Sequence, residues 1–302
     1  MISGGQTDRL IGNQMMLKRH RVLLGVLLNA PHVPTRTELM KWAFLMREET
    51  PLSSEHSFYD FVPHKYGPFS FLVYRDLEEL RRLGYLSDNT LAIRPPVAPQ
   101  AASSFMSLAS RYRGAVEYVL TRYGSLSRAQ LVRVVYENYP WFASRSQLDP
   151  HSRRVPVGEP AIYTIGYEGK SIDCFMKCLL KASINRIIDV RMNAVSRKYG
   201  FAKVTLSRIG AALGIGYAHF PELGTSRQER HGLRTQEDYD GLLDRYEESV
   251  LPRVQESRRE AAALMAESPS VLVCFESDSR YCHRGRLAQA ISTDVGLEVV
   301  HL

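Results

Sequence analysis

The last third of the chain carries a run of residues whose types and spacing suit catalysis. Cys274-x-Glu276-x-Asp278 is followed by Cys282-His283-Arg284. Glu276 leaves the end of an apolar segment, where a carboxyl group can have a raised pKa and act as a general acid or base. It could also stabilise an oxocarbenium-like sugar cation, as cleavage of an N-glycosidic bond requires. The alternative is that Glu276 pairs with an arginine and only fixes the loop.

The elements that must position this run alternate between strand and helix. Strands are expected over 162–166, 186–191, 216–220, 271–275 and 298–301, and helical segments over 172–182, 204–213, 236–266 and 283–292. This alternation predicts an α/β fold over residues 161–302, with a Rossmann-like, mostly parallel sheet covered on both faces. Ligands of such sheets gather at the carboxyl ends of the strands.

Polar side chains follow each expected strand, and several of them are cationic. The cations are Arg191, Arg197, Lys198, Arg284 and Arg286. The helix that Cys282 opens adds positive potential at its N-terminus, so the pocket should favour a phosphate. A lattice of these arginines with Asp189, Glu276 and Asp278 is the alternative. The predicted catalytic residues are Glu276, Asp189 and Glu168, and the predicted phosphate- or ligand-binding residues are Arg191, Ser196, Lys198, Tyr167, His219, Asp278, Cys282, His283 and Arg284.

Cysteine and metal chemistry are weaker interpretations of the same residues. Cys282 should have a lowered pKa at a helix N-terminus, but the phosphatase-type loop of Cys, five residues and Arg is absent. Cys274, Cys282, His283 and His219 lack zinc-ligand spacing, and neighbouring strand residues point to opposite faces, so we predict no zinc site. We predict no cofactor, with one alternative left open. The carboxylates of Asp189, Glu276 and Asp278 could hold magnesium or manganese for phosphodiester hydrolysis.

Four motifs of this half resemble the domain-of-unknown-function family numbered 488. They are residues 164–169, Asp189-Val190-Arg191 with Ser196-Arg197-Lys198, residues 217–224, and the cysteine-containing run described first. The resemblance covers residues 161–302 and implies a Rossmann-like α/β domain. Some members of the family occur in prokaryotic mobile or defence contexts and are suspected of acting on nucleic acids or nucleotides.

Residues 1–95 are expected to form a winged-helix module. Helices are predicted over 19–28, 35–45 and 68–83, with Thr35 and Glu38 in capping-box spacing, and a short hairpin over 85–93. Residues 58–61, 64–70, 76–80 and 83–86 resemble winged-helix modules of prokaryotic regulators and antitoxin-like proteins. That resemblance implies DNA binding or protein docking, and it allows a homo-oligomer through this part.

A helical extension is predicted over residues 105–148, with Ser127 as a helix cap. Its aromatic side chains Tyr136, Tyr139, Trp141 and Phe142 could stack on bases, although a clamp that holds the extension to the wing is favoured. Segments 94–104 and 144–160 have linker composition, and residues 149–160 form the predicted linker before the α/β domain.

Composition limits the class of protein. The chain has 302 residues, 44% apolar and 24% charged, which is globular rather than disordered composition. No membrane span or signal peptide is expected, and four cysteines without a disulfide pattern fit a reducing cytoplasm. Residues 1–160 hold 20 basic and 14 acidic side chains, a net +6, whereas residues 161–302 hold 19 and 18, a net +1.

The basic half suggests nucleic acid as the partner. The predicted DNA contacts are Lys65, Arg75, Arg81, Arg82, Arg227, Arg230 and Arg234. The favoured function is a DNA-directed enzyme of prokaryotic defence or repair that accepts an extruded nucleotide and cleaves its N-glycosidic bond. The alternatives are a metal-dependent nuclease, a regulator that binds DNA and senses a nucleotide without catalysis, and a docking module within a larger defence complex.

Overall fold

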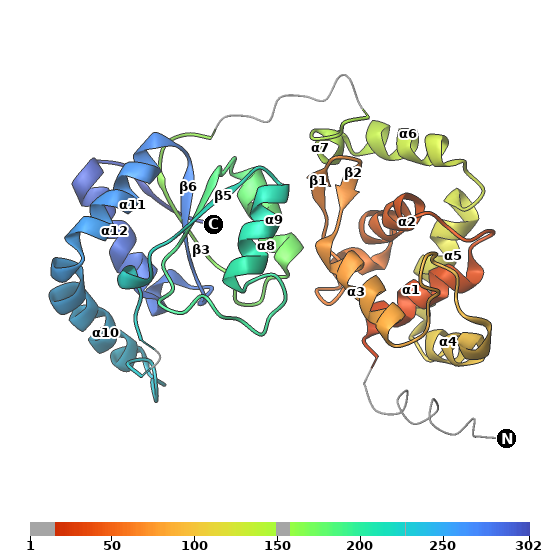
Figure 1. Ribbon diagram of the computed structural model, residues 1–302, viewed down its shortest axis with the longest axis horizontal. Helices are drawn as coiled ribbons and strands as arrows, with labels where there is room; N and C mark the ends of the chain where they lie inside the picture. The colour runs from red at the N-terminus through yellow and green to blue at the C-terminus, as the bar shows by residue number, and fades with distance from the viewer. Residues whose placement is uncertain (1–15, 149–157, 227) are drawn as a thin grey trace. The chain divides into compact units, whose positions relative to one another are not determined.

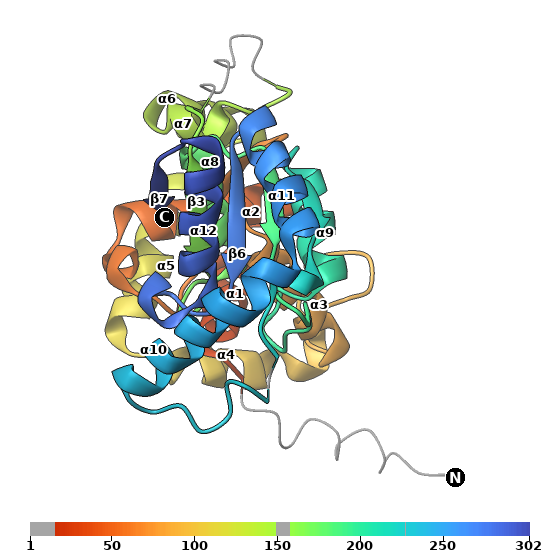
Figure 2. The same cartoon turned by 90° about the vertical axis from the view of Figure 1, so that its left-hand side faces the viewer.

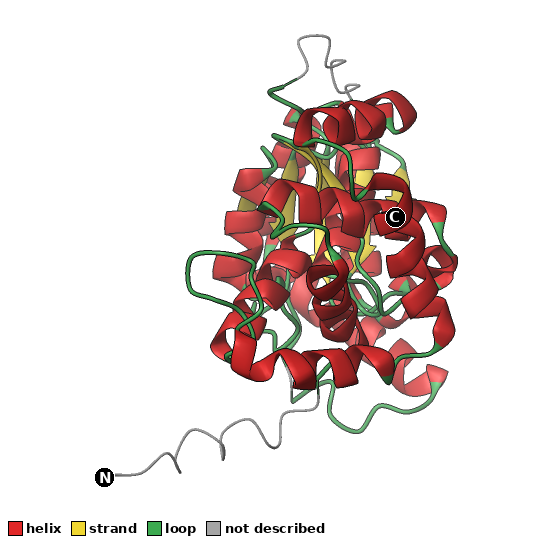
Figure 3. Ribbon diagram, turned by 90° about the vertical axis from the view of Figure 1, so that its right-hand side faces the viewer, coloured by secondary structure: helices red, strands yellow, loops and turns green. Residues whose placement is uncertain are grey.

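A computed structural model of the chain describes residues 16–148, 158–226 and 228–302 (Figure 1). The chain divides into two compact units, residues 1–153 and 154–302. The first is mostly helical with a small hairpin, and the second contains a five-stranded parallel sheet, so the predicted fold class is confirmed. Helices account for most of the regular structure (Figure 3). In the described part of the chain, no helix is long and apolar enough to span a bilayer.

The amino-terminal unit begins with helices α1 (Lys18–Asn29) and α2 (Arg36–Glu49). The predicted capping box at the start of α2 is confirmed, because the Thr35 side chain accepts from the Glu38 backbone while Glu38 accepts from the Thr35 backbone. Strands β1 (Val62–His64) and β2 (Gly67–Phe69) then form an antiparallel hairpin before α3 (Phe71–Arg82). The predicted hairpin over 85–93 is reduced to a single antiparallel bridge between Leu86 and Ile93.

The linker predicted over residues 94–104 is wrong. A short 3-10 helix (Pro95–Val97) leads directly into α4 (Ala98–Met106). Proline is compatible with the first turn of a helix, where its missing N–H has no partner to lose. Phe105 of α4 covers Gly25 of α1 so closely that a side chain at Gly25 would overlap the ring. This segment is therefore part of the packed helical unit.

The predicted helical extension comprises α5 (Ser110–Tyr123), α6 (Arg128–Asn138) and α7 (Pro140–Ala143), with Ser127 capping α6. Two of its aromatic side chains pack on α2, and the ring of Tyr136 lies against Gly67 of the β1–β2 hairpin. The rings of Tyr139 and Phe142 lie 5.0 and 4.6 Å from the ring of Phe44. Most of the predicted linker, residues 149–157, lies outside the described residues.

The carboxyl-terminal unit is built on β3 (Ile162–Gly166), β4 (Arg186–Asp189), β5 (Gly216–His219), β6 (Ser270–Cys274) and β7 (Val299–His301). All neighbours pair in parallel in the order β5-β4-β6-β3-β7. The chain therefore moves outward from β3 to β4 and β5, and then returns to β6 and β7. Because parallel crossovers are right-handed, this reversal puts the two sets of helices on opposite faces.

Helices α8 (Ile172–Lys181) and α9 (Lys203–Ala212) cover one face of the sheet (Figure 1). Helices α11 (Gln255–Glu267) and α12 (His283–Val295) cover the other, where they lie in front of β3 and β6 in Figure 2. Their buried side chains pack with Ile162, Ile188 and Leu272 of the strands. The expected helical segment 236–266 is α10 (Gln236–Arg245), a π turn (Tyr246–Val250), a 3-10 turn (Leu251–Arg253) and α11.

Candidate functional site

The neighbouring strands β4 and β6 are followed by helices on opposite faces of the sheet, α9 after β4 and α12 after β6. Such a reversal opens a crevice at the carboxyl ends of the strands, where ligands of α/β sheets bind. The residues after these two strands are therefore brought together by topology rather than by sequence spacing.

Cys274, Cys282 and His283 meet at this point. Cys274 is the last residue of β6, Cys282 is the N-cap of α12, and His283 is the first residue of that helix. Their potential ligand atoms all lie within 4.8 Å of one another, and the three residues are 0%, 2% and 1% exposed. We call these three residues the thiol–imidazole cluster. The strand end and the helix start bring these three side chains together from two directions, which their sequence spacing did not indicate. The absence of a zinc site stays a prediction.

The hydrogen bonds of His283 assign its tautomer. Its Nε2 lies 3.1 Å from the carbonyl oxygen of Val190, which can only accept, so Nε2 carries the proton. Its Nδ1 lies 3.1 Å from Nη2 of Arg230, which can only donate. Nδ1 of His283 also lies 3.9 Å from each of the two sulfur atoms.

Arg230 and Glu276 form the more exposed side of the cluster. Nη1 of Arg230 donates to Oε1 of Glu276 at 2.8 Å, and its Nε donates to Thr225 at 2.7 Å. The Glu276 side chain is 16% exposed and that of Arg230 is 27% exposed. Arg230 was predicted to contact a nucleic-acid backbone, but its guanidinium lies against this cluster. Glu276 therefore pairs with an arginine, as the alternative prediction for this residue stated.

Burial and neighbouring groups shift the pKa values of Glu276, Cys274 and Cys282. Burial raises the pKa of Glu276, and the adjacent Cys274 adds to that rise. Burial opposes ionisation of Cys274, but the Cys282 thiol, the neighbouring His283 and the Arg230 guanidinium hold the pKa of Cys274 well below its usual range. Burial and the neighbouring Cys274 raise the pKa of Cys282. Of the two thiols, Cys274 therefore ionises more readily than Cys282.

Asp189 and Arg191 form a separate, closed network. Nε and Nη2 of Arg191 donate to the two oxygens of Asp189 at 2.8 and 2.5 Å. Nη1 donates to the Tyr167 hydroxyl and the Phe201 carbonyl, and the Tyr217 hydroxyl donates to Asp189 at 2.7 Å. This is the arginine–carboxylate lattice foreseen as the alternative to phosphate binding. The predicted catalytic role of Asp189 and phosphate contact of Arg191 stay untested, and this geometry does not favour them.

The remaining predicted site residues mainly hold loops. Arg284 is buried and donates to the carbonyls of Glu276 and Ser277 at 2.5 and 2.9 Å, which fixes the loop after β6. Glu168 accepts from the Ser277 backbone at 3.1 Å. The other contacts are Asp278 with Arg280, Ser196 with the Lys198 backbone, Lys198 with the Tyr167 carbonyl, and His219 with the Arg191 carbonyl and Lys203.

The predicted DNA contacts are spread over both units. Arg81 and Arg82 pair with Glu78 and Glu79 of their own helix, at 2.7 Å each. Lys65 and Arg234 are exposed, and Arg75 lies on α3. Arg227 lies outside the described residues. These positions leave the predicted DNA interface untested.

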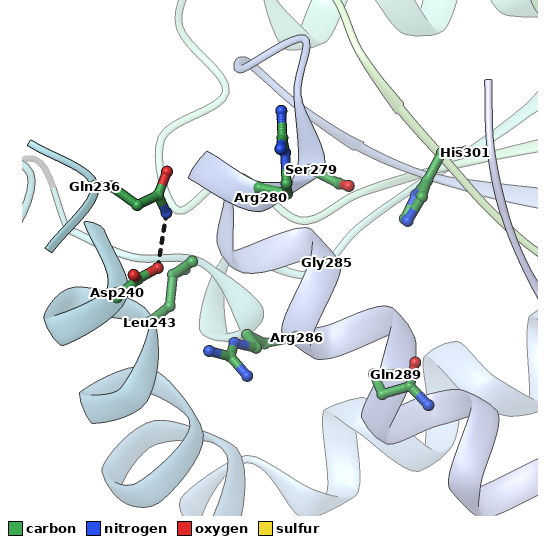
Figure 4. A pocket seen from close by; sticks show the side chains of 9 residues that line it. All are labelled: Gln236, Asp240, Leu243, Ser279, Arg280, Gly285, Arg286, Gln289 and His301. Carbon is green, nitrogen blue, oxygen red and sulfur yellow. Dashed lines mark hydrogen bonds between the residues drawn. The ribbon is translucent and has the colours of Figure 1, made fainter.

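A hollow of about 400 Å³ lies beside α10 and α12 (Figure 4). In it, the Gln236 amide donates to Asp240 at 2.8 Å. The lining residues are Gln236, Asp240, Leu243, Ser279, Arg280, Gly285, Arg286, Gln289 and His301. None belongs to the thiol–imidazole cluster, so the hollow is not the centre of the chemistry described above.

Residues 171–291 match the family described as "Domain of unknown function DUF488". This stretch is a DUF488 domain. It contains the thiol–imidazole cluster, Arg230 and Glu276, and it confirms the predicted family resemblance for these residues. Comparisons with curated proteins and with solved structures give no match. No finding identifies the amino-terminal unit as a winged helix, so that assignment stays a prediction.

Two features of the site escaped the sequence analysis. Cys274 was absent from the predicted site residues, although its position at the end of an apolar strand and beside Glu276 could have indicated it. Arg230 was predicted as a nucleic-acid contact, because nothing in the local sequence shows that its loop folds back onto β6 and Glu276.

Proposed function

We propose that the DUF488 domain is a metal-dependent hydrolase that holds Zn²⁺ between Cys274, Cys282 and His283. The observation that carries this proposal is the convergence of these three donors, all buried, within 4.8 Å. Two thiolates and one imidazole are the ligand types that zinc prefers, and three protein ligands leave a position for water or substrate.

The orientation of His283 supports the same conclusion. Imidazoles that bind metals usually donate their second N–H to a carbonyl or carboxylate, which fixes the ring and its tautomer. The contact from Nε2 of His283 to the Val190 carbonyl, at 3.1 Å, is of this kind. The ring is therefore held with Nδ1 close to the sulfur atoms, where a bound metal would replace its contact with Arg230.

The exposed side of the cluster supplies the groups that a hydrolase needs. A bound zinc ion lowers the pKa of a coordinated water and so provides a nucleophile. Glu276 lies beside Cys274, with Oε2 3.4 Å from the sulfur, where it could take up a proton from that water. Arg230 holds Glu276 through Oε1 and leaves its own guanidinium partly exposed toward an anionic substrate.

Among the predicted reactions, this geometry favours metal-assisted hydrolysis over N-glycosidic cleavage. A two-carboxylate mechanism needs a second free acid near Glu276. Asp189 is occupied by Arg191 and Tyr217, and Glu168 by the Ser277 backbone. Nucleic acid stays our proposed substrate because of the net +6 on residues 1–160.

The test begins with the metal content of the purified full-length protein. We expect stoichiometric zinc in the wild type and in a Cys178→Ser control, and loss of zinc in Cys282→Ser and His283→Gln. Cys178 lies on α8 and is not part of the cluster. Zinc retention by both cluster variants would refute the site.

Activity is tested separately on plain and modified duplex and single-stranded DNA, with products separated before and after alkali. Cleavage that 1,10-phenanthroline abolishes and added zinc restores supports the hydrolase. Breaks that appear only after alkali, without metal dependence, would favour the glycosidic alternative. Stoichiometric zinc with intact substrates throughout would mean that the metal is structural and would refute the proposed activity.

A further inference from the structure

The amino-terminal unit contains a cavity of about 270 Å³ between α2, the β1–β2 hairpin and α3. Met40, Pro68 and Phe69 give it apolar walls, while Arg36 and Lys41 supply cations. The complete lining is Arg36, Thr37, Met40, Lys41, His64, Tyr66, Gly67, Pro68, Phe69 and Tyr74. No acidic residue is among them.

Lys41 is the unusual member of this lining. It is 1% exposed, and its ammonium group donates to the Tyr66 carbonyl. The ammonium also lies 5.6 Å from the centre of the Tyr136 ring. In the described part of the chain, no carboxylate lies within ion-pair distance of Lys41. A lysine buried in this way normally has a paired charge.

The backbone is shaped to admit the ammonium group. Gly67 has a φ of +86°, a conformation that favours glycine. A Cβ at this position would lie 2.7 Å from Nζ of Lys41 and 2.6 Å from the Tyr136 ring. Glycine at position 67 therefore leaves room for the ammonium group of Lys41, which lies beside the cavity.

Burial of Lys41 changes the pKa of its ammonium group. Burial lowers the pKa of Lys41 to about 7. A ligand that brought a negative charge next to the ammonium would supply the counter-ion that the fold does not provide. At the rim, the Arg36 guanidinium lies 5.3 Å from the centre of the Tyr74 ring and 3.7 Å from a carboxylate oxygen of Glu78, so among the described residues Lys41 is the cation of this lining that has no ion pair.

We propose that this cavity binds a small organic acid with an apolar body, such as a monocyclic aromatic carboxylate. Its carboxylate lies beside Lys41, and its ring packs among Met40, Pro68 and Phe69. A cationic ligand would meet the like charge of Lys41, and a neutral ligand would leave Lys41 without a counter-ion. The site is independent of the proposed zinc site, because all its residues belong to the other unit.

The test is binding of benzoate and phenylacetate to the full-length protein by calorimetry, with benzamide and benzylamine as neutral and cationic matches. We expect the acids to bind at least tenfold more tightly than either match, a difference of about 1.4 kcal/mol. Equal binding of acid and amide, or no binding of either acid at millimolar concentration, would overturn the proposal.

Variants separate the site from the general positive charge of this unit. Lys41→Met keeps the length of the side chain and should remove the preference for acids, whereas Lys18→Met, at an exposed position of α1, should retain it. Thr37→Phe partly fills the cavity without removing Lys41 and should weaken both acids. Unchanged binding in folded Lys41→Met and Thr37→Phe would refute the assignment.

Discussion

Gly166 of the sheet packs against the backbone of Glu276, beside the thiol–imidazole cluster. Replacing Gly166 with alanine tests whether this close packing keeps the cluster and Glu276 in place. Gly166 is the last residue of β3 and pairs with Cys274 of β6. A Cβ added here would lie 2.5 Å from the carbonyl carbon of Glu276 and closer still to its oxygen. These are backbone atoms, so no side-chain rotation relieves the overlap.

The size of the effect follows from these distances. Cβ contacts under 3.0 Å do not occur in practice, so the carbonyl group of Glu276 in the loop after β6 must move by more than one ångström. Overpacking of this kind costs about 2 kcal/mol. For a unit of 149 residues that loss lowers the Tm by roughly 4–8 °C. The same movement displaces Glu276 relative to Cys274, so zinc affinity should fall about tenfold or more.

The assay follows thermal unfolding by far-UV circular dichroism, with zinc affinity measured by competition with a coloured chelator. Both tryptophans, Trp42 and Trp141, lie in the amino-terminal unit, so the tryptophan fluorescence transition should not change. Gly241→Ala is the matched control. A Cβ there meets only Arg245 at 3.6 Å, and alanine inside α10 should stabilise the helix by up to about 1 kcal/mol. A Gly166→Ala protein with wild-type stability and zinc affinity would refute the proposed coupling.

Two further predictions concern the amino-terminal unit. Asp76→Ala should destabilise it by about 3–5 kcal/mol in chemical denaturation, because buried Asp76 accepts from Arg19 at 2.5 Å and from the Tyr59 hydroxyl at 2.9 Å. Removing the exposed ion-pair partner Glu137 should cost under about 1 kcal/mol, and equal losses would contradict this ranking. The Lys41 pKa of about 7 lies below its unfolded value of 10.5, so the unfolded chain binds more protons between these pH values. Relative to Lys41→Met, wild-type stability should therefore rise by about 1.4 kcal/mol per pH unit from pH 7 to pH 10, and a constant difference would show that Lys41 keeps its ordinary pKa.

The sequence determined the features that depend on neighbouring residues. The capping boxes at Thr35 and Ser127 follow from side chains three positions apart, which contact each other as soon as a helical turn forms. Alternating apolar strands and helices were sufficient to predict a parallel α/β sheet, because each crossover needs about one helix. The predicted boundaries of β3 were correct. The linker prediction over residues 94–104 failed because proline was interpreted only as a helix breaker.

Tertiary structure decided which residues meet at the site. The order β5-β4-β6-β3-β7 depends on pairing between distant segments, and local patterns contain no information about it. Long-range packing folds the loop of Arg230 back onto Glu276, 46 positions further along the chain, whereas Cys274, Cys282 and His283 meet within the single connection from β6 to α12. Asp189 and Arg191 pair locally, but long-range packing places Tyr167, Phe201 and Tyr217 around them. Residue types alone therefore predicted where chemistry could occur, whereas long-range packing determined which of those side chains are accessible and which are already hydrogen-bonded.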